Sequence, residues 1–269
     1  MGVYGSLLSH RGSILEHKLS AFPIHPAATA YMKGMNIRHN AAAHEKNRVI
    51  LKLDFQNFFP SITVSDWDRL LRTRRPAGVE LADTRYYRLL LFWGQRSPTP
   101  KCLSIGAPTS PALSNIIMHG LDIQLARAAN SSGVTYTRYA DDITASGKKV
   151  EDVRQFERRA VQIINASRSP SLTFNEEKRG IYLKGQKRMV TGLIITPPGT
   201  ISIRRERKRL ISVMLHKVEL GSSDIDHLNY LKGMLGFCIA NEPDFVTRMR
   251  RKYGPALVDY VLKFNPPTP

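Results

Sequence analysis

Residues 134–146 read VTYTRYADDITAS. Two runs rich in β-formers, 134–140 and 143–146, flank the pair Asp141 and Asp142. Two strands separated by two polar residues predict a β-hairpin with both acids at its tip. Aspartate is common in turns, so this pair alone indicates a turn rather than a function.

A third acid lies at the end of another predicted strand. Residues 49–53 read VILKL, a short apolar run that predicts a buried strand ending at Asp54. An acid in this position is costly unless a cation meets it. Three carboxylates that converge from neighbouring strands can hold two Mg²⁺ ions about 3.5–4 Å apart. Such a centre supports phosphoryl transfer, because one ion activates a hydroxyl and the other holds a triphosphate.

The rest of the chain predicts an α+β body up to residue 203, followed by a basic helical module. Apolar residues at helical spacing predict helices over 63–74, 80–93, 111–129, 150–167, 210–218, 224–240 and 243–263. Short strands are predicted within 181–203, with a turn at the Pro-Pro-Gly of 197–199. The expected fold class is therefore α+β.

The charge balance indicates a polyanionic partner. The 269 residues contain 40 Lys+Arg and 22 Asp+Glu, a net charge of +18. This excess favours nucleic acid, with an acidic membrane surface as the alternative. No apolar run is long enough to span a bilayer, and two cysteines, Cys102 and Cys238, do not make a disulfide scaffold. We therefore expect a cytoplasmic protein that does not enter a membrane.

Three stretches, in a fixed order, resemble the sequence boxes of the reverse transcriptases. They read LKLDFQNFFPSI (51–62), GAPTSPALSN (106–115) and YADD (139–142), and residues 175–196 resemble the boxes that follow. The resemblance implies a right-hand polymerase with minimal fingers, a ferredoxin-like (RRM-like) palm with an antiparallel sheet, and a helical thumb. It implies an N-terminal/fingers region at 1–48, a palm at 49–203 with an inserted fingers segment at about 63–105, and a basic helical thumb at 204–269.

The resemblance also implies which residues carry the chemistry. Asp54, Asp141 and Asp142 would bind the two Mg²⁺ ions, with the backbone carbonyl of Phe55 as a further ligand. Phe59 falls where the family has an aromatic ring beneath the sugar. A ring in that place leaves no room for a 2′-hydroxyl, so it favours deoxynucleoside triphosphates and hence DNA synthesis.

Further residues are implied to contact the nucleotide. Ala107 belongs to the box that positions template and nucleotide, and Lys178 is placed to donate to the triphosphate or to the leaving pyrophosphate. A solvated surface lysine is the alternative for Lys178. Lys33 and Arg38 lie where fingers residues grip the triphosphate. The family has Gln directly before the glycine of the GAPTSP box, whereas this chain has Ile105.

Two short signatures resemble those of bacterial retron reverse transcriptases. Residues Asn40 to His44 read NAAAH, and Val190, Thr191 and Gly192 read VTG. Group II intron enzymes carry sequence motifs related to VTG. Asn40 and His44 either recognise a structured RNA or hold a loop in place, and the resemblance implies that Val190, Thr191 and Gly192 also bind RNA.

Basic residues gather at the start of the predicted helical module. Arg204, Arg205 and Lys208 fall where a thumb would grip the phosphates of an A-form duplex. A solvated helix face is the alternative, because runs of charge often have no other role.

The leading hypothesis is a retron reverse transcriptase. Such an enzyme would copy a structured noncoding RNA, which serves as template and primer, into a short single-stranded DNA covalently joined to RNA (msDNA). The resemblance implies a role in antiphage defence together with a retron effector protein. Two alternatives remain: another bacterial reverse transcriptase, group II intron-like or defence-associated, and a catalytically idle RNA-binding scaffold that neutralises a toxin.

Overall fold

Two compact units make up the chain. The computed structural model describes residues 18–77, 79, 84–94 and 101–266. Unit 1 comprises Met1–Asn36 and Asn47–Tyr182, and unit 2 comprises Ile37–Lys46 and Leu183–Pro269. The division into fingers, palm and thumb is a functional one, and it stays a prediction.

Unit 1 is built on a four-stranded sheet. Its strands are β1 (Val49–Asp54), β2 (Thr135–Tyr139), β3 (Asp142–Gly147) and β4 (Gly180–Leu183), in the spatial order β2-β3-β1-β4. β3 pairs antiparallel with both β1 and β2. The predicted strand at 49–53 and the predicted hairpin strands are therefore confirmed.

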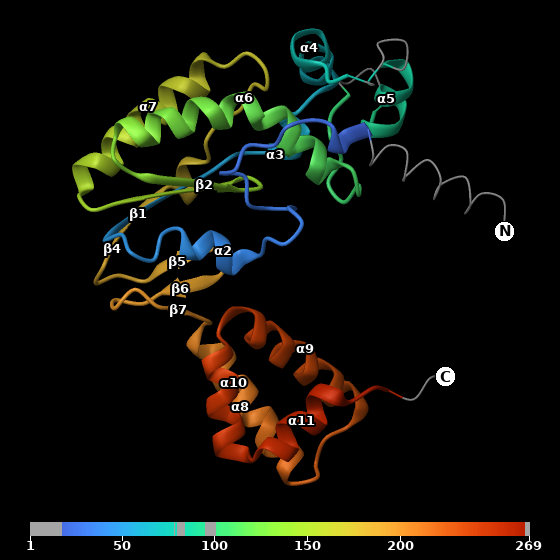
Figure 1. The fold of residues 1–269 in the computed structure, drawn as a ribbon, viewed down its shortest axis with the longest axis vertical. Coiled ribbons are helices and arrows are strands. Elements are labelled where there is room, and N and C mark those ends of the chain that lie inside the picture. The colour runs from blue at the N-terminus through green and yellow to red at the C-terminus, as the bar shows by residue number, and fades with distance from the viewer. Residues whose placement is uncertain (1–17, 78, 80–83, 95–100, 267–269) are drawn as a thin grey trace, which may run out of the picture. The chain divides into compact units, whose positions relative to one another are not determined.

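Helices α6 (Ser110–Ser131) and α7 (Val150–Ala166) lie over one face of this sheet (Figure 1). Both helices were expected from the apolar spacing. α7 buries one stripe of its surface because apolar residues recur there at helical spacing. That stripe consists of Val153, Phe156, Ala160 and Ile164.

The strand β1 sends alternate side chains to opposite faces of the sheet. Val49, Leu51 and Leu53 belong to the same core cluster as the buried stripe of α7. The side chains of Lys52 and Asp54, one residue out of phase, therefore project from the other face. This alternation places the charged end of β1 away from the helical layer.

Three shorter helices lie between β1 and α6 in the sequence: α3 (Phe58–Ser61), α4 (Val64–Arg74) and α5 (Thr84–Leu91). α4 begins after Thr63, whose backbone N–H and hydroxyl donate to Asp66 Oδ2 at 2.7 and 2.9 Å. The hydroxyl of Ser169 donates to Asp66 Oδ1 at 2.7 Å. Asp66 is buried, so one carboxylate joins the start of α4 to a loop far along the chain. Residues 80–83 of the helix expected at 80–93 lie outside the described residues.

Unit 2 combines a small antiparallel sheet with helices. Its elements are α2 (Ile37–Ala42), β5 (Arg188–Val190), β6 (Leu193–Ile195), β7 (Ile201–Ser202), α8 (Arg205–Glu219), α9 (Ile225–Asn241), α10 (Pro243–Tyr253) and α11 (Pro255–Lys263). The strands lie in the order β5-β6-β7, and α2 packs against them. α2 was not expected from the sequence, because six residues are too few for a helical period to show.

The turn between β5 and β6 has a conformation that few residues accept. Val190 pairs with Leu193, so Thr191 and Gly192 form a two-residue turn, with φ of 46° and 84°. Positive φ at both positions is the type I′ hairpin turn, which favours glycine at its second position. Thr191 Oγ1 donates to the carbonyl of Ile37 at 3.1 Å, which ties this turn to the start of α2.

The C-terminal helices differ from the expectation at one point. The single helix expected at 243–263 is two helices, α10 and α11. Gly254 separates them with φ of 87°, and Pro255 opens α11. Proline has no N–H to continue a helix, which explains the break. Among the helices described, none is both long and apolar enough to cross a bilayer.

Replacing Asp66 with alanine tests the link between α4 and the 169 loop. The change removes the acceptor of three hydrogen bonds, so we expect a loss of about 1–3 kcal/mol in the free energy of unfolding. Urea unfolding followed by circular dichroism measures it. Glu151→Ala is the matched control, since Glu151 is an exposed acid in the first turn of α7. Equal stabilities of the two variants would contradict the assigned role of Asp66.

Candidate active site

The pairing register of the central strands brings two acids together. Asp54 ends β1, Asp142 begins β3, and the two residues lie directly opposite each other. Directly opposite residues on antiparallel strands have neighbouring Cβ atoms on the same face of the sheet. Asp142 therefore lies beside Asp54 on the face of the sheet opposite α6 and α7.

The third acid lies in the hairpin turn itself. Tyr139 pairs with Asp142, so the two-residue tip consists of Ala140 and Asp141. The expectation that both acids occupy the tip was wrong by one position, because β3 begins one residue earlier than predicted. The backbone N–H of Phe55 donates to the carbonyl of Asp141 at 3.2 Å, which holds the tip against the end of β1.

Two lysines pair with these acids. Lys178 Nζ lies 2.9 Å from Asp54 Oδ1, and Lys52 Nζ lies 3.4 Å from Asp142 Oδ1. The Lys178 side chain is 60% exposed yet is bound to an acid of the cluster, so it is not a plain surface lysine. The segment that carries Lys178 is held at the end of β1, because the N–H of Asn175 donates to the carbonyl of Asp54 at 2.7 Å.

Lys52 is a site residue that the sequence analysis missed. A signal for it exists in the sequence, because Lys52 interrupts an apolar strand two residues before Asp54. Residues two apart on a strand share a face. A lysine in that position is therefore placed on the same face as the acids.

The acids strain one another electrostatically. Burial raises the pKa of Asp141, and the neighbouring charges of Asp54 and Asp142 raise it further. The hydrogen bond to Asp54 raises the pKa of Lys178 in turn. The cluster thus concentrates negative charge that favours a cation.

The donor set fits a hard divalent cation, although it is not a finished metal cage. Within the described residues, no three or more His, Cys, Asp or Glu side chains are arranged as a ready metal site. Lys52 and Lys178 pair with carboxylate oxygens that a bound metal ion would also use as ligands. Carboxylate and carbonyl oxygens are the ligands that Mg²⁺ prefers, and mutual repulsion among three carboxylates is what such an ion relieves.

An open pocket of about 660 Å³ lies at the acid cluster. Asp54, Asp141 and Lys178 line it together with Phe59 and Ile105. Phe59 is half-buried and its ring meets Phe58 edge-on at 5.4 Å between centroids. Ile105 is 77% exposed, so an apolar side chain lines this pocket at the position where the family has Gln.

Aromatic residues at this pocket form a stack of rings. Phe55 stacks on Phe58 and on Phe174 at centroid distances of 5.8 and 5.0 Å. Phe58 is buried in the core of unit 1. The Phe59 ring packs edge-on against Phe58, which belongs to this stack.

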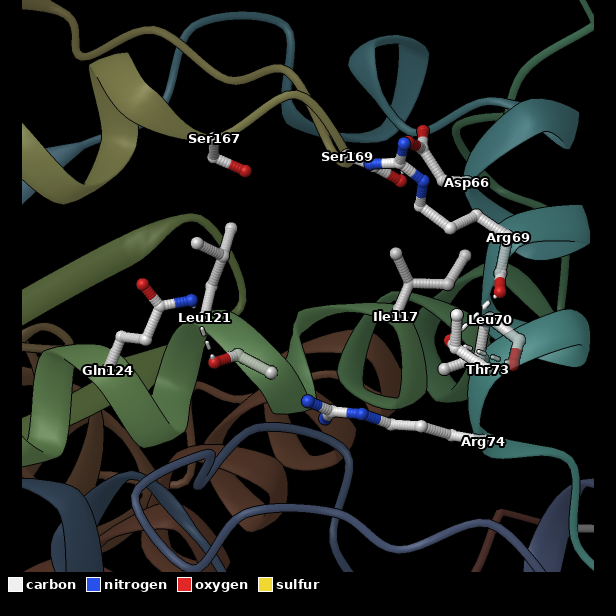
Figure 2. A pocket seen from close by; sticks show the side chains of 11 residues that line it. Asp66, Arg69, Leu70, Thr73, Arg74, Ile117, Leu121, Gln124, Ser167 and Ser169 are labelled. Carbon is white, nitrogen blue, oxygen red and sulfur yellow. Dashed lines mark hydrogen bonds between the residues drawn. The ribbon is translucent and has the colours of Figure 1, made fainter.

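A second pocket in unit 1 has a different character (Figure 2). It has a volume of about 190 Å³ and is lined by residues of α4 and α6, with Ser167 and Ser169 across from them. Its acid is Asp66, whose oxygens accept the three hydrogen bonds already described. This pocket contains none of the predicted site residues.

Two predicted nucleotide contacts in unit 1 lie outside the acid-lined pocket. Ala107 lies in the turn before α6, where the N–H of Ser110 donates to its carbonyl at 3.2 Å. Lys33 is exposed, and neither residue lines the pocket. Arg38 belongs to unit 2, where its guanidinium donates to the carbonyl of Asn241 at 2.5 Å.

The two short signatures meet inside unit 2. α2 carries Asn40 and contacts β5 and β6, whose turn contains Thr191. Asn40 and His44 are buried, and burial lowers the pKa of His44 to about 3. Burial of both side chains supports the alternative in which they hold a loop in place.

The basic residues at the start of α8 divide into two kinds. Arg204 and Arg205 are exposed. Lys208 instead binds Glu242 Oε1 and Ser202 Oγ, each at 2.7 Å. Although burial alone would raise the pKa of Glu242, Lys208 and Arg248 hold it below the usual value. Lys208 is thus held in a partly buried ion pair with Glu242.

Comparison with known sequences gives concordant relatives. A sequence model described as "Reverse transcriptase (RNA-dependent DNA polymerase)" matches residues 5–203. The retron Ec83 reverse transcriptase of Escherichia coli is 32% identical over 246 residues, which cover 90% of this chain and 78% of that protein. The retron Ec73 reverse transcriptase of Escherichia coli is 33% identical, with 89% and 78% covered. The retron Mx65 reverse transcriptase of Myxococcus xanthus is 33% identical, with 88% and 56% covered.

Solved structures show the same type of fold at low identity. Telomerase from Candida albicans, solved with a fragment of telomeric RNA, superposes with a TM-score of 0.52 and 12% identity over 94% of this chain. Apo telomerase from Candida tropicalis gives a TM-score of 0.51 with 10% identity over 73%. This chain spans 48% and 45% of those telomerase chains, so the likeness concerns the fold alone.

The sequence matches cover most of the chain, and the mixed fold with antiparallel sheets agrees with them. The family match also includes all three acids of the cluster and the hairpin that carries two of them. The chain therefore belongs to the retron reverse transcriptases and is an RNA-directed DNA polymerase.

Proposed function

We propose that this polymerase copies a structured noncoding RNA into a short single-stranded DNA that stays joined to RNA (msDNA). The observation that carries the proposal is the convergence of Asp54, Asp141 and Asp142 at one end of the sheet, where Asp54 and Asp141 line a pocket together with Phe59. The substrates are deoxynucleoside triphosphates, and an RNA 2′-hydroxyl is the primer. The proposal includes a cytoplasmic location and a retron effector protein as partner in antiphage defence.

In this proposal the end of the sheet that carries the acids is a palm, preceded by minimal fingers. The helices α8 to α11 are the thumb, with Arg204 and Arg205 facing the phosphates of a duplex. A net charge of +18 supports an extended nucleic-acid partner. The retron names of the relatives support a structured RNA as that partner.

The three acids, with the carbonyl of Phe55, would hold two Mg²⁺ ions. When bound, these ions supply the acidity that activates the primer hydroxyl and the charge that stabilises the triphosphate. Two observations support the role of Phe55: its N–H donates to the carbonyl of Asp141, and Phe55 lines the same pocket as Asp54 and Asp141. The protein's part is to fix the positions of these oxygens.

Lys178 would act on the triphosphate side of the pocket. Its ammonium group pairs with Asp54, and its long side chain is 60% exposed. An incoming triphosphate offers this ammonium group a stronger partner than one carboxylate. Lys178 then stabilises the negative charge on the leaving pyrophosphate or donates a proton to it.

Phe59 would select the sugar. Its ring lines the pocket and rests on the buried stack of Phe58 and Phe55. A supported ring cannot move aside for a 2′-hydroxyl. Deoxynucleotides are therefore accepted and ribonucleotides are excluded by contact.

The decisive experiment examines the nucleic acid that copurifies with the protein. The chain is expressed with its flanking noncoding DNA, and bound nucleic acid is run on a denaturing gel before and after RNase and DNase. We expect a discrete DNase-sensitive band that shifts with RNase. If only RNA is bound, and the Asp141→Asn, Asp142→Asn double variant binds the same RNA, the scaffold alternative is supported. Activity that survives replacement of the noncoding RNA would indicate another class of reverse transcriptase.

Removing the charge of the two hairpin acids should abolish synthesis. For Asp141→Asn with Asp142→Asn we expect at least about a 10³-fold loss of nucleotide incorporation, since both metal positions lose ligands. Binding of the RNA, measured by filter retention, should stay within about threefold, because phosphate contacts made elsewhere dominate it. Asp152→Asn on α7 is the matched control and should leave both unchanged. Wild-type incorporation by the double variant would rule out the proposed centre.

Truncating the ring of Phe59 should relax sugar selection. For Phe59→Ala we expect ribonucleotide use, relative to deoxynucleotide use, to rise by about 10- to 100-fold in kcat/KM. Primer extension with each nucleotide type measures the ratio. Pro60→Ala is the control, because Pro60 lines the same pocket and has no aromatic ring. An unchanged ratio in Phe59→Ala would remove Phe59 from this role.

The repulsion among the acids predicts that removing the charge of Asp141 stabilises the metal-free protein. Because the pKa of Asp141 is raised, its charged form is disfavoured in the folded metal-free protein. In EDTA at pH 7, Asp141→Asn should raise Tm by about 1–2 °C, and the gain should be lost as the pH falls below the raised pKa of Asp141 and on toward the ordinary pKa of an unfolded aspartate. Added Mg²⁺ should reverse the order, because the wild type binds it more tightly. Thermal scans at two pH values, with and without Mg²⁺, measure this; a lower Tm for the variant in EDTA would contradict it.

A further inference from the structure

A buried ion pair lies directly behind the hairpin tip. Arg138 is the next-to-last residue of β2, and Asp122 lies on α6. Arg138 Nη2 donates to Asp122 Oδ2 at 2.6 Å, and Nε donates to Oδ1 at 2.8 Å. Both side chains are fully buried, at 0% exposure. The pair is thus a two-pronged contact in the interior of unit 1.

The acid of this pair has a third donor. The hydroxyl of Tyr136 donates to Asp122 Oδ1 at 2.8 Å. Tyr136 and Arg138 are two apart on β2, so both project from the same face of the strand toward α6. Asp122 therefore accepts three hydrogen bonds from β2 and fixes the end of that strand to the helix.

The remaining arm of the guanidinium reaches the tip itself. Arg138 Nη1 donates to the carbonyl of Ala140 at 2.9 Å. Ala140 has a φ of 57°, a left-handed conformation that an alanine adopts only when its surroundings impose it. Ala140 immediately precedes Asp141. The direction of its carbonyl fixes the peptide plane from which Asp141 begins.

The backbone of Arg138 is itself clamped. Its N–H donates to the carbonyl of Ala27 at 2.7 Å, and its carbonyl accepts from the N–H of Thr29 at 2.9 Å. The hydroxyl of Thr29 donates to the same carbonyl at 3.2 Å. The guanidinium therefore has a fixed base from which to hold Ala140.

Stability alone does not account for this arrangement. A buried ion pair is often replaceable by apolar residues of similar volume without loss of stability, because removing two charges from water is costly. What apolar residues cannot supply is a rigid donor aimed at one carbonyl. The location of that carbonyl, one residue before an acid of the cluster, points to a role in geometry.

We propose that Asp122 and Arg138 are positioning residues, which hold the peptide between Ala140 and Asp141 so that the carboxylate of Asp141 faces Asp54. This inference rests on the proposed role of Asp141 as a metal ligand. Neither residue contacts the nucleotide. Their effect is expected on the turnover step and on Mg²⁺ affinity, with nucleotide and RNA binding preserved.

The test replaces the ion pair without stranding a charge. The variant carries Asp122→Leu, Arg138→Met and Tyr136→Phe, and Tyr136→Phe alone is the matched control, which keeps the contact to Ala140. For the triple variant we expect kcat to fall and half-saturating Mg²⁺ to rise, each by about 10- to 100-fold. We expect the nucleotide KM and RNA affinity to stay within about twofold. Mg²⁺ binding to the protein without nucleotide, measured by calorimetry, gives a readout independent of activity.

The outcomes separate the possibilities. A folded triple variant with wild-type kcat and wild-type Mg²⁺ affinity would overturn the positioning role. If the triple variant does not fold, Arg138→Lys decides, because a lysine can pair with Asp122 but cannot also reach Ala140 with a rigid fork. Wild-type kcat and Mg²⁺ affinity in Arg138→Lys would then overturn the proposal. Full activity of the Asp141→Asn, Asp142→Asn variant would instead defeat the proposed function on which it rests.

Discussion

The antiparallel register of β1 and β3 is the constraint on which the site depends. It sets Asp54 opposite Asp142, and the N–H of Phe55 then reaches the carbonyl of Asp141. A slip of one residue would send every side chain of one strand to the other face. The apolar alternation of Val49, Leu51 and Leu53 against the helical layer forbids such a slip. The packing of the core and the placement of the acids are therefore one requirement.

The local pattern of the sequence was sufficient for much of this fold. Long periodic segments such as α6 and α7, and the apolar run of β1, follow directly from residue spacing. The tip of the hairpin was misplaced by one residue, because Ala140 adopts a left-handed conformation that composition does not reveal. The break at Gly254 was missed because the apolar period continues across it. Ion pairs such as Lys52 with Asp142 depend on strand register, which no single stretch of sequence encodes.

The retron signatures illustrate how a motif can be structural in a specific way. VTG places its glycine where a type I′ turn needs positive φ, and its threonine hydroxyl reaches the first residue of α2. NAAAH contributes the buried Asn40 and His44 to the same unit. The two signatures lie some 150 residues apart in the sequence, and the hydrogen bond from Thr191 to Ile37 connects VTG to the helix α2 that carries Asn40. The occurrence of both signatures in one chain is therefore consistent with the contacts between α2 and the strands β5 and β6.

The acid cluster and the buried ion pair behind it differ in how far their negative charges are neutralised by neighbouring groups. The cluster keeps three negative charges close together and relieves them only partly with Lys178 and Lys52. The ion pair does the reverse, because Asp122 is fully satisfied by donors from β2. An unsatisfied charge at the open end of the sheet attracts cations, and a satisfied one in the interior resists displacement. A polymerase hairpin needs both, since a strained tip stays in place only if the structure behind it does not yield.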